Sequence, residues 1–339
     1  MTSSASSASS GPHSLPRIVD VAALAGVSPS TASKALNDTG QLRASTRERV
    51  RRAAEQLGFT PDGRGRALAS GRSYTVGLVT TDSTGRFSIP IMLGAEDALS
   101  AGEMAMLLCD TRDDPLRERH YIRSLMAHRV DGIIVTGRRT EPREPISVPI
   151  PVVYAFNPSM DASHPSVVVD DRGGATSAVE HLLDLGRERI VHITGPERHL
   201  SATERAAAAV ESAGDVFVGT PLFGEWSERW GRHAVDRALR QWPRLDAITC
   251  GSDQIARGVC DRLRELGRAV PEDVAVTGFD NWGVMAEASR PPLTTVDLEL
   301  EELGRRTAQL LLDAISGSQH SGLLRMPTRL VPRESTLGS

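Results

Sequence analysis

The stretch from Ile18 to Asn37, IVDVAALAGVSPSTASKALN, limits the fold more than any other part of the chain, because it predicts two short helices joined by a tight turn. The apolar residues that recur at helical spacing in the first helix are Val19, Val21, Ala22 and Ala25. Gly26 then ends this helix, since glycine adopts a left-handed cap without steric cost. Ser28 is placed to cap the second helix, and Pro29 falls in its first turn, where a missing N–H is harmless. The pattern favours a helix-turn-helix, and the alternative is an ordinary helical hairpin.

A third helix is predicted over Thr46 to Leu57. Ser45 and Glu48 form a capping-box pattern at its start. Its apolar side would consist of Val50, Ala53, Ala54 and Leu57. Gly58 ends the helix and Pro61 prevents its continuation, so the sequence predicts a three-helix headpiece.

Basic residues are concentrated near the amino terminus. Residues 15–73 hold ten basic residues against five acidic ones, whereas the rest of the chain holds 29 against 38. Because phosphates supply most of the non-specific attraction between a protein and DNA, a basic segment on an acidic body suits a nucleic-acid binder. Lys34, the one lysine in the chain, stands in the second helix of the turn motif.

From Tyr74 onward, short β-branched runs alternate with amphipathic stretches. Five runs come first, at 75–81, 105–111, 131–137, 151–156 and 166–170, and a second set follows at 189–195, 215–220, 247–252 and 274–280. This alternation is typical of parallel sheets covered by helices. The nine strands in two groups predict an α/β core of two subdomains, with a ligand crevice between the carboxyl ends of their strands.

The motifs DVAALAGVSPSTASKALN and STRERVRRAAEQLGFTPDGRGRALASGRS resemble the DNA-binding headpiece of the lactose-repressor (LacI/GalR) family, and the likeness continues through most of the chain. The resemblance implies a helix-turn-helix headpiece at 15–60, a hinge helix at 61–73, and an effector-binding and dimerisation core at 74–339.

The resemblance also implies which residues of the second helix meet DNA. The positions that would read bases are Pro29, Ser30 and Lys34, and those that would contact the DNA backbone are Thr31, Ser33 and Asn37. Lysine replaces the arginine that is common at position 34, so it would contact guanine without arginine's planar fork. Proline and serine offer little to bases, and the operator sequence therefore stays open.

In the family, the hinge helix folds on operator DNA and inserts a leucine into the minor groove. Leu68 matches that leucine, and Arg64 and Arg66 would lie near phosphates. Such a wedge costs a few kcal/mol of unstacking, which the contacts of the bent duplex recover. The two glycines of DGRGRAL depart from the family pattern, because each weakens a helix by about 1 kcal/mol relative to alanine. The alternative is a plain flexible linker.

For the core, the resemblance implies two subdomains arranged like those of a periplasmic sugar-binding protein. The chain would cross between them near Val169, Val296 and His320. Subdomain N is expected to comprise 74–168 plus 297–320, and subdomain C is expected to comprise 169–296 plus 321–333. A small-molecule effector, expected to be a sugar or a sugar derivative, would bind between them.

Carried over residue by residue, the resemblance assigns effector contacts to Ser201, Arg205, Trp226 and Asp280. An arginine fork suits sugar hydroxyls or carboxylates, and a strand-end aspartate would accept hydrogen bonds from effector hydroxyls. Trp226 would pack on the ligand ring. The alternatives are that Arg205 pairs with Glu204 or another surface acid, and that Trp226 belongs to the core.

Three positions depart from the family pattern. Ser252 stands where many relatives have asparagine, Phe156 where some have aspartate, and Leu298 where some have glutamine. The predicted pocket is consequently less polar than in some relatives, which leaves the effector's identity open. Phe87 and Pro90, in the loop after the first strand, are expected to form its apolar wall.

No catalytic constellation accompanies this pocket in the sequence, which has no phosphate-binding glycine motif after a predicted strand, no Gly-x-Ser-x-Gly and no zinc-ligand spacing. We therefore expect no enzyme activity, no cofactor and no metal. Cys109, Cys250 and Cys260 are too scattered for a disulfide framework, and no apolar run of about 18 residues predicts a membrane span. Residues 1–14 are expected to be a disordered tail and not a signal peptide. The three scattered cysteines indicate a reducing compartment, so the protein is expected in the cytoplasm, at the nucleoid.

The sequence thus predicts a ligand-responsive transcriptional repressor that binds double-stranded operator DNA. A homodimer is expected, because LVPRESTLGS at the end of the chain has no leucine heptads for a coiled-coil tetramer. The rivals are a sugar-binding transport component, which the headpiece argues against, and an enzyme. Activation in place of repression, and corepression in place of induction, stay open at this point.

Overall fold

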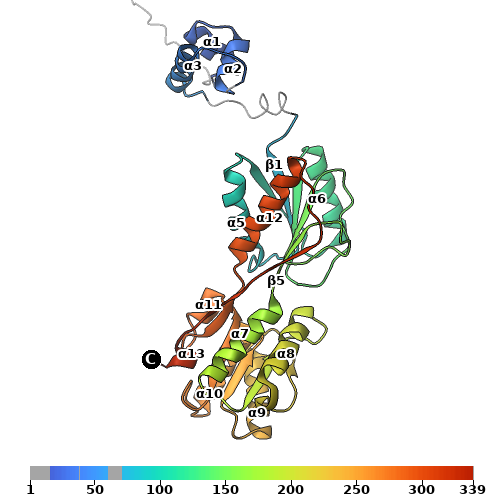
Figure 1. Cartoon of the computed structure of the whole chain (residues 1–339), viewed down its shortest axis with the longest axis vertical. Coiled ribbons are helices and arrows are strands. Elements are labelled where there is room, and N and C mark those ends of the chain that lie inside the picture. The colour runs from blue at the N-terminus through green and yellow to red at the C-terminus, as the bar shows by residue number, and fades with distance from the viewer. Residues whose placement is uncertain (1–15, 38, 60–70, 339) are drawn as a thin grey trace, which may run out of the picture. The chain divides into compact units, whose positions relative to one another are not determined.

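The computed structural model describes residues 16–37, 39–59 and 71–338, in two units that divide between Tyr74 and Thr75 (Figure 1). The expected tail at 1–14 and the hinge residues Arg64, Arg66 and Leu68 lie outside the described residues. Within the ranges that the structure describes, no helix is long and apolar enough to cross a membrane.

The headpiece is the first unit, and its three helices are α1 (Ile18–Ala25), α2 (Pro29–Leu36) and α3 (Ala44–Leu57). They enclose a small core whose buried residues are all alanine or valine: Val21, Ala22, Ala25, Ala32, Ala35, Val50, Ala53 and Ala54. Such short side chains let three short helices approach closely. The longer polar side chains of α2 lie outside this core.

The predicted turn between α1 and α2 is confirmed. Gly26 has φ 64°, in the left-handed region, and the Ser28 hydroxyl accepts a hydrogen bond from the Thr31 N–H at 3.1 Å. Two details were wrong. Val19 is 44% exposed and does not belong to the apolar stripe of α1. The helix α3 begins at Ala44 with Arg43 as its cap, so the predicted capping box does not form.

The core unit begins with a parallel six-stranded sheet in the order β11-β5-β4-β3-β1-β2. Its strands are β1 (Thr75–Thr80), β2 (Ala105–Asp110), β3 (Gly132–Thr136), β4 (Val152–Ala155), β5 (Ser166–Val169) and β11 (Leu323–Met326). The helices α5 (Ser88–Ser100) and α12 (Leu300–Ile315) cover one face, and α6 (Pro115–Ala127) covers the other (Figure 1). We call this half the N-lobe. Its helices α5 and α12 meet at glycine, since a Cβ at Gly94 would lie 1.8 Å from the Glu301 carbonyl oxygen.

The second half, the C-lobe, has its own six-stranded sheet in the order β12-β10-β9-β8-β6-β7. Its strands are β6 (Ile190–Thr194), β7 (Leu222–Phe223), β8 (Ala247–Cys250), β9 (Ala275–Asp280), β10 (Thr294–Asp297) and β12 (Arg329–Val331), and only β12 runs antiparallel to its neighbour. The helices are α7 (Asp171–Asp184), α8 (Leu200–Ala213), α9 (Glu228–Gln241), α10 (Asp253–Glu265), α11 (Gly283–Ala286) and α13 (Glu334–Leu337). The side chains packed on both faces of this C-lobe sheet are apolar. Cys250 and Cys260 are buried free thiols of the C-lobe, and Cys109 is a buried free thiol of the N-lobe.

The two sheets place the three crossings between the lobes (Figure 1). The first follows Val169 and the second follows Asp297. The third was expected near His320, which was wrong: β11 pairs with β5 in the N-lobe, so the chain crosses only after Met326. Residues 321–326 therefore belong to the N-lobe and not to subdomain C.

One predicted strand is also wrong. Residues 215–220 overlap a short 3-10 turn, Gly214–Val216. Among the described residues, their one contact of strand type is an isolated bridge from Phe217 to Ile190. The edge of the sheet is formed instead by β7, two residues long, a little further along the chain. Glycines at 214 and 219 both have positive φ and break the extended conformation between them.

Candidate functional site

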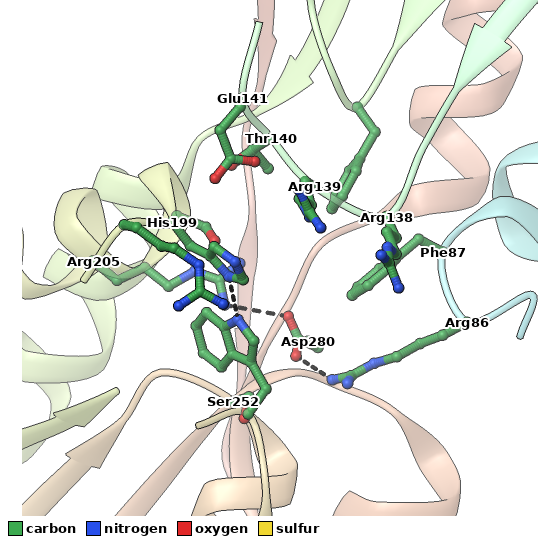
Figure 2. Close-up of a pocket in the computed structure, with 14 residues that line it drawn as sticks. Arg86, Phe87, Arg138, Arg139, Thr140, Glu141, His199, Arg205, Ser252 and Asp280 are labelled. Carbon is green, nitrogen blue, oxygen red and sulfur yellow. Dashed lines mark hydrogen bonds and ion pairs between the residues drawn. The ribbon is translucent and has the colours of Figure 1, made fainter. Parts of the chain in front are cut away.

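A cavity of about 240 Å³ lies between the two lobes, and its lining residues follow the carboxyl ends of strands in both sheets (Figure 2). The N-lobe contributes Arg86 and Phe87 after β1, residues 138–141 after β3, and Phe156 after β4. The C-lobe contributes residues from just before α8 and from its first two turns, residues after β7 and β8, and the last residue of β9, namely Arg198, His199, Ser201, Arg205, Trp226, Ser252 and Asp280. The predicted crevice is therefore present, because the ends of parallel strands leave their loops at one edge.

Asp280 lies at the centre of this cavity and is held by arginines from both lobes (Figure 2). Its Oδ1 is 3.4 Å from Arg205 Nη1, and its Oδ2 accepts a hydrogen bond from Arg86 Nη2. Arg205 also donates to Asp171 Oδ1 at 2.7 Å and to the Gly251 carbonyl at 2.6 Å. The side chain of Asp280 is only 5% exposed, so these are ion pairs in a low-dielectric environment.

Burial and charge act against each other in this network. Burial raises the pKa of Asp171, although the neighbouring Arg205 opposes that shift. Burial alone would lower the pKa of Arg205, but Asp171 and Asp280 raise it overall, so the guanidinium stays charged. Asp253 lies next to the network, and burial together with the charge of Asp280 raises its pKa to about 7.

Arg205 lines the cavity as expected, but its donors are directed at protein atoms. Its partners are the buried Asp171 and Asp280, and not Glu204, which pairs with Arg172 at 3.5 Å. Its guanidinium also lies 3.8 Å from the ring centre of Phe279, whose ring it covers. Arg205 is thus part of the floor that holds Asp280 in place.

Arg86 is a functional candidate that the sequence prediction missed. It comes from the N-lobe yet bonds to Asp280 and, at 3.1 Å, to Gln254 of the C-lobe. Its guanidinium stacks 4.6 Å from the ring centre of Trp282. The signal that could have found it is its place directly before Phe87, in a loop that follows a predicted strand.

Aromatic rings line two walls of the cavity. Phe87 and Phe156 stack with their ring centres 4.9 Å apart and form an apolar wall, which contains Phe87 of the predicted pair Phe87 and Pro90 but not Pro90. In the C-lobe, Trp226 Nε1 donates to His199 Nδ1 at 2.8 Å. Trp226 is half-buried and packs against the C-lobe core, so it belongs both to that core and to the cavity wall.

A second contact joins the lobes at the start of α8. Glu141, in the loop after β3, accepts a hydrogen bond from the Leu200 N–H at 2.9 Å through its Oε1. The helix has His199 at its cap without a side-chain hydrogen bond, so a carboxylate from the other lobe satisfies its first turn. Within the described residues, the Glu141 Oε2 and the hydroxyl of Thr140 are buried without a hydrogen-bond partner.

Two residues of the site have a backbone conformation that side chains rarely adopt. Phe156 has φ 74° and Asp280 has φ 102°, and such positions cost on the order of 1–3 kcal/mol each. Phe156 directly follows the central strand β4, and Asp280 is the last residue of the central strand β9. The surrounding packing therefore holds these two side chains toward the cavity against local strain.

Of the remaining residues predicted for the site, some line this cavity and others lie elsewhere. Ser201 and Ser252 line the cavity, and Ser252 also caps α10 by accepting from the Ile255 N–H at 3.3 Å. Pro90 lies apart, in a neighbouring cavity of about 360 Å³ that shares Arg86, Phe87 and Asp280. Leu298 is fully buried in the N-lobe core and does not reach the cavity. Within the described residues, no cluster of His, Cys, Asp and Glu is arranged to hold a metal ion.

In the headpiece, α2 presents a polar face. Pro29, Ser30 and Lys34 are exposed, whereas Thr31, Ser33 and Asn37 are half-buried at its edges. Asn37 Nδ2 donates to the Ser33 hydroxyl at 3.3 Å. The structure thus leaves all three predicted base-reading residues accessible on one short helix.

Comparison with known proteins agrees with this architecture. Residues 17–62 match the model for bacterial regulatory proteins of the lacI family, and residues 179–336 match a periplasmic binding protein-like domain. The chain is 33% identical to the HTH-type transcriptional regulator CelR of Thermobifida fusca, over 94% of this chain and 98% of the relative.

Solved structures show the same fold. The structure of the transcriptional regulator CelR in complex with cellobiose is 30% identical, with a TM-score of 0.65 over 94% of this chain and 99% of that one. The lac repressor dimer bound to operator and the anti-inducer ONPF has a TM-score of 0.75 over 95% of this chain and 99% of that one, at 24% identity. The α/β fold with an amino-terminal helix-turn-helix is confirmed, and the chain belongs to the LacI family of bacterial regulatory proteins.

Proposed function

We propose that this regulator is a repressor that binds operator DNA as a homodimer, and that a carbohydrate held between the lobes changes its affinity for that DNA. The observation that carries the proposal is Asp280, which ends a C-lobe strand and is bonded to Arg86 of the N-lobe inside the cavity. A molecule that enters this cavity contacts both lobes. It therefore binds one arrangement of the lobes better than another, which is what an effector needs in order to shift an equilibrium.

The effector contacts that we propose are those the cavity brings together. Phe87, Phe156 and Trp226 supply apolar surface for a sugar ring, as aromatic rings commonly do in small-molecule sites. The polar contacts would come from Ser201, Arg205, Ser252 and Asp280. The cellobiose in the similar CelR structure supports a carbohydrate as the effector class.

The DNA contacts that we propose lie on α2. Pro29, Ser30 and Lys34 would meet base edges, and Thr31, Ser33 and Asn37 would position the helix on the DNA backbone. The hinge contacts Arg64, Arg66 and Leu68 are carried forward from the sequence resemblance, with Leu68 as the minor-groove wedge.

A dimer is supported by the edge of the N-lobe sheet. The edge strand β2 exposes Leu107 and Leu108 at 38% and 55%, and the neighbouring α5 exposes Ile89 and Leu93. Exposed apolar residues on a sheet edge are typical of protein–protein contact. The similar lac repressor structure is a dimer on its operator.

We further infer that the effector is bound and released unchanged, since the relatives are transcriptional regulators and not enzymes. The place of action would be the cytoplasm, at the nucleoid, where operator DNA is found.

Two measurements test the proposal. Selection from random duplex DNA should return a near-palindromic site, because a twofold dimer presents two copies of α2 to successive major grooves. A thermal-shift screen against a sugar library should then find a compound that raises the melting temperature and changes operator affinity in fluorescence anisotropy. A protein that selects no sequence, or that binds one half-site as a monomer, would contradict the proposal.

A further inference from the structure

We infer that the effector carries an acid group, a carboxylate or a phosphate ester, and that the guanidinium groups of Arg138, Arg139 and Arg198 bind it. This inference rests on the proposed function, because it names the chemical class of the molecule that the cavity would hold. It concerns residues that neither the motifs nor the family resemblance pointed to.

The three arginines surround the cavity from both lobes. Arg138 and Arg139 follow β3 of the N-lobe, and Arg198 precedes α8 of the C-lobe. Figure 2 shows the side chains of Arg138 and Arg139 reaching from the N-lobe into the cavity, on the side of Phe87. Planar guanidinium groups bind carboxylates and phosphates by two parallel hydrogen bonds, so three of them favour an anion.

Two carboxylates, Asp113 and Glu141, stand against these three arginines, which leaves one positive charge over. Arg138 and Arg139 share one carboxylate, that of Asp113, at 3.2 Å and 3.8 Å. The side chains of Arg138, Arg139 and Asp113 are each about half exposed, at 50–52%. Exposed ion pairs of this kind are weak, so a ligand can replace them. Within the residues that the structure describes, no ion pair includes Arg198.

His199 adds a neutral donor to the same wall. Burial lowers its pKa, and Arg139, Arg198 and Arg138 lower it further against the opposing effect of Glu141, so the ring is uncharged at neutral pH. Because its Nδ1 accepts from Trp226, the remaining proton is assigned to Nε2, which can donate to a ligand. The polarity of the cavity is therefore weighted toward donors.

Acceptors in the cavity are few. Both oxygens of Asp280 are bonded to arginines, and Glu141 Oε1 is bonded to the Leu200 N–H, so among the carboxylate oxygens of the described cavity only Glu141 Oε2 is free to accept from a ligand. A neutral sugar brings a hydrogen on every hydroxyl, and each such hydrogen needs an acceptor, whereas an ionised acid group brings acceptors alone. The hydroxyl of Thr140, only 8% exposed and without a partner among the described residues, is a further donor for such a group.

The start of α8 attracts anions from the same side. This helix of 14 residues directs its first N–H groups toward the loop after β3, where the carboxylate of Glu141 accepts from Leu200. Helix amino termini carry partial positive charge and favour carboxylates and phosphates. The carboxylate of Glu141 already occupies this position, so the acid group of the ligand is expected beside it, at the three arginines.

The size of the site suits a sugar that bears such a group. A third cavity, of about 310 Å³, shares Arg138, Arg139 and Glu141 with the first. The stacked rings of Phe87 and Phe156 lie in the first cavity and offer a surface for a sugar ring. An acid substituent would then lie where the two cavities join. The ligand class is a sugar acid or a sugar phosphate.

The experiment compares matched sugars on the full-length protein. Glucose, galactose and cellobiose are titrated beside glucuronate, galacturonate and glucose 6-phosphate, with inorganic phosphate as the simplest anion, in thermal-shift and calorimetric assays. We expect at least one acid to bind at least tenfold more tightly than its neutral counterpart. The preference should shrink between 50 and 300 mM salt, because the contact is ionic. Uronates and the phosphate ester then separate the two kinds of acid.

Variants decide whether the arginines are responsible. R138Q, R139Q and R198Q should each weaken binding of the preferred acid severalfold and leave operator affinity without effector unchanged. R237Q, on the exposed side of α9, is the matched control and should behave as wild type. Neutral sugars that bind as tightly as the acids would overturn the inference while the proposed function stands. Acids that bind nowhere, or equally to wild type and the three variants, would also overturn it. Failure of operator selection would count against the proposed function alone.

Discussion

In the headpiece, the residues of α2 expected to meet DNA are exposed or half-buried, and the buried residues of the core beneath them are all alanine or valine. In the α/β core, the residues at the floor of the cavity are buried and bonded to one another: Arg205, Asp171 and Asp280 form ion pairs inside the C-lobe, and Arg86 joins them from the N-lobe. In the headpiece, the residues expected to recognise DNA are therefore largely distinct from those that stabilise the fold, whereas at the floor of the cavity the same residues are expected to serve both purposes. A change on α2 alters recognition and leaves the fold intact, whereas a change at Asp280 or Arg205 alters both.

This difference bears on how each region can diversify. The polar face of α2 can exchange Lys34 or Ser30 for other residues at little cost in stability, because neither side chain is part of the headpiece core. The floor of the cavity cannot, since removing one member of a buried ion pair leaves its partner without compensation. New effector specificity is then expected to arise at the exposed arginines of the cavity mouth, Arg138, Arg139 and Arg198, and not at the floor.

The largest expected effect tests the floor of the cavity. Arg205→Ala should lower the free energy of unfolding of the core by about 3–5 kcal/mol, because Asp171 and Asp280 stay buried without their shared cation. Urea unfolding followed by tryptophan fluorescence measures the core alone, since the four tryptophans lie at 226, 230, 242 and 282. DNA binding by the headpiece should persist below the unfolding transition.

The matched control removes the other partner of Asp280. Arg86→Ala should cost clearly less stability than Arg205→Ala, because Asp280 then keeps Arg205 and the lobe contact alone is lost. If Arg205→Ala unfolds within about 1 kcal/mol of wild type, the buried network is not what supports the core, and the contrast with the headpiece fails.

The second effect is a dependence of core stability on pH. The folded-state pKa of Asp253 is raised to about 7, above its ordinary value of 3.8, so the folded core holds a proton there that the unfolded chain has released. Stability should therefore fall as pH rises from about 4 to 7, by up to about 1.4 kcal/mol per pH unit from this group.

Asp253→Asn isolates this contribution. Urea unfolding of wild type and variant at several values between pH 5 and 8 should give a flatter slope for the variant, with the wild type losing its relative advantage as pH rises. Parallel slopes would mean that Asp253 stays ionised in the folded core.

A third, smaller effect compares two serine caps. The Ser28 hydroxyl caps α2 and the Ser252 hydroxyl caps α10, at 3.1 Å and 3.3 Å from the N–H groups that they accept from. Each alanine substitution should lower the free energy of unfolding of its own region by about 1 kcal/mol. Hydrogen exchange measured by mass spectrometry should show lost protection in the headpiece for Ser28→Ala and in α10 for Ser252→Ala. Only the second should also weaken effector binding, because only Ser252 lines the cavity. Loss of protection in both regions from either variant would contradict this separation.

Much of the fold could be predicted because buried parallel strands are continuous apolar runs. The strand β3, for example, is buried at every residue and stands out as GIIVT. The strands β11 and β12 were not predicted, since β11 is largely exposed, β12 is mostly half-buried, and the two carry Arg325 and Arg329 in place of a continuous apolar run. Missing β11 is why the third crossing was expected near His320.

The site was predictable only where one segment carries its own signal. Asp280 and Arg205 were assigned because the segments that contain them resemble the family's effector-binding segments. The contacts that join the lobes were not, because Arg86 and Asp280 are 194 residues apart and Glu141 and Leu200 are 59 apart. Nothing in local pattern indicates which loop end of one sheet meets which loop end of the other. That pairing is decided by how the two lobes close, which is a property of the whole core.

The smallest expected change in stability belongs to Lys34→Ala. Lys34 is exposed near the end of α2 and is not part of the headpiece core, so the variant should unfold like wild type. Its effect should appear in recognition, because contacts to bases specify a sequence whereas contacts to phosphates only position the protein. Loss of a single lysine contact to guanine should reduce the preference for the selected operator over random DNA by about 1 kcal/mol or more, near the lower end of base-contact effects. Ser33→Ala serves as the comparison, since a residue that contacts the DNA backbone should weaken binding to both DNAs alike. Anisotropy titrations of both variants at one fixed salt concentration separate the two roles. Equal losses on operator and random DNA for Lys34→Ala would make it a phosphate contact and would leave base reading to the other exposed residues of α2.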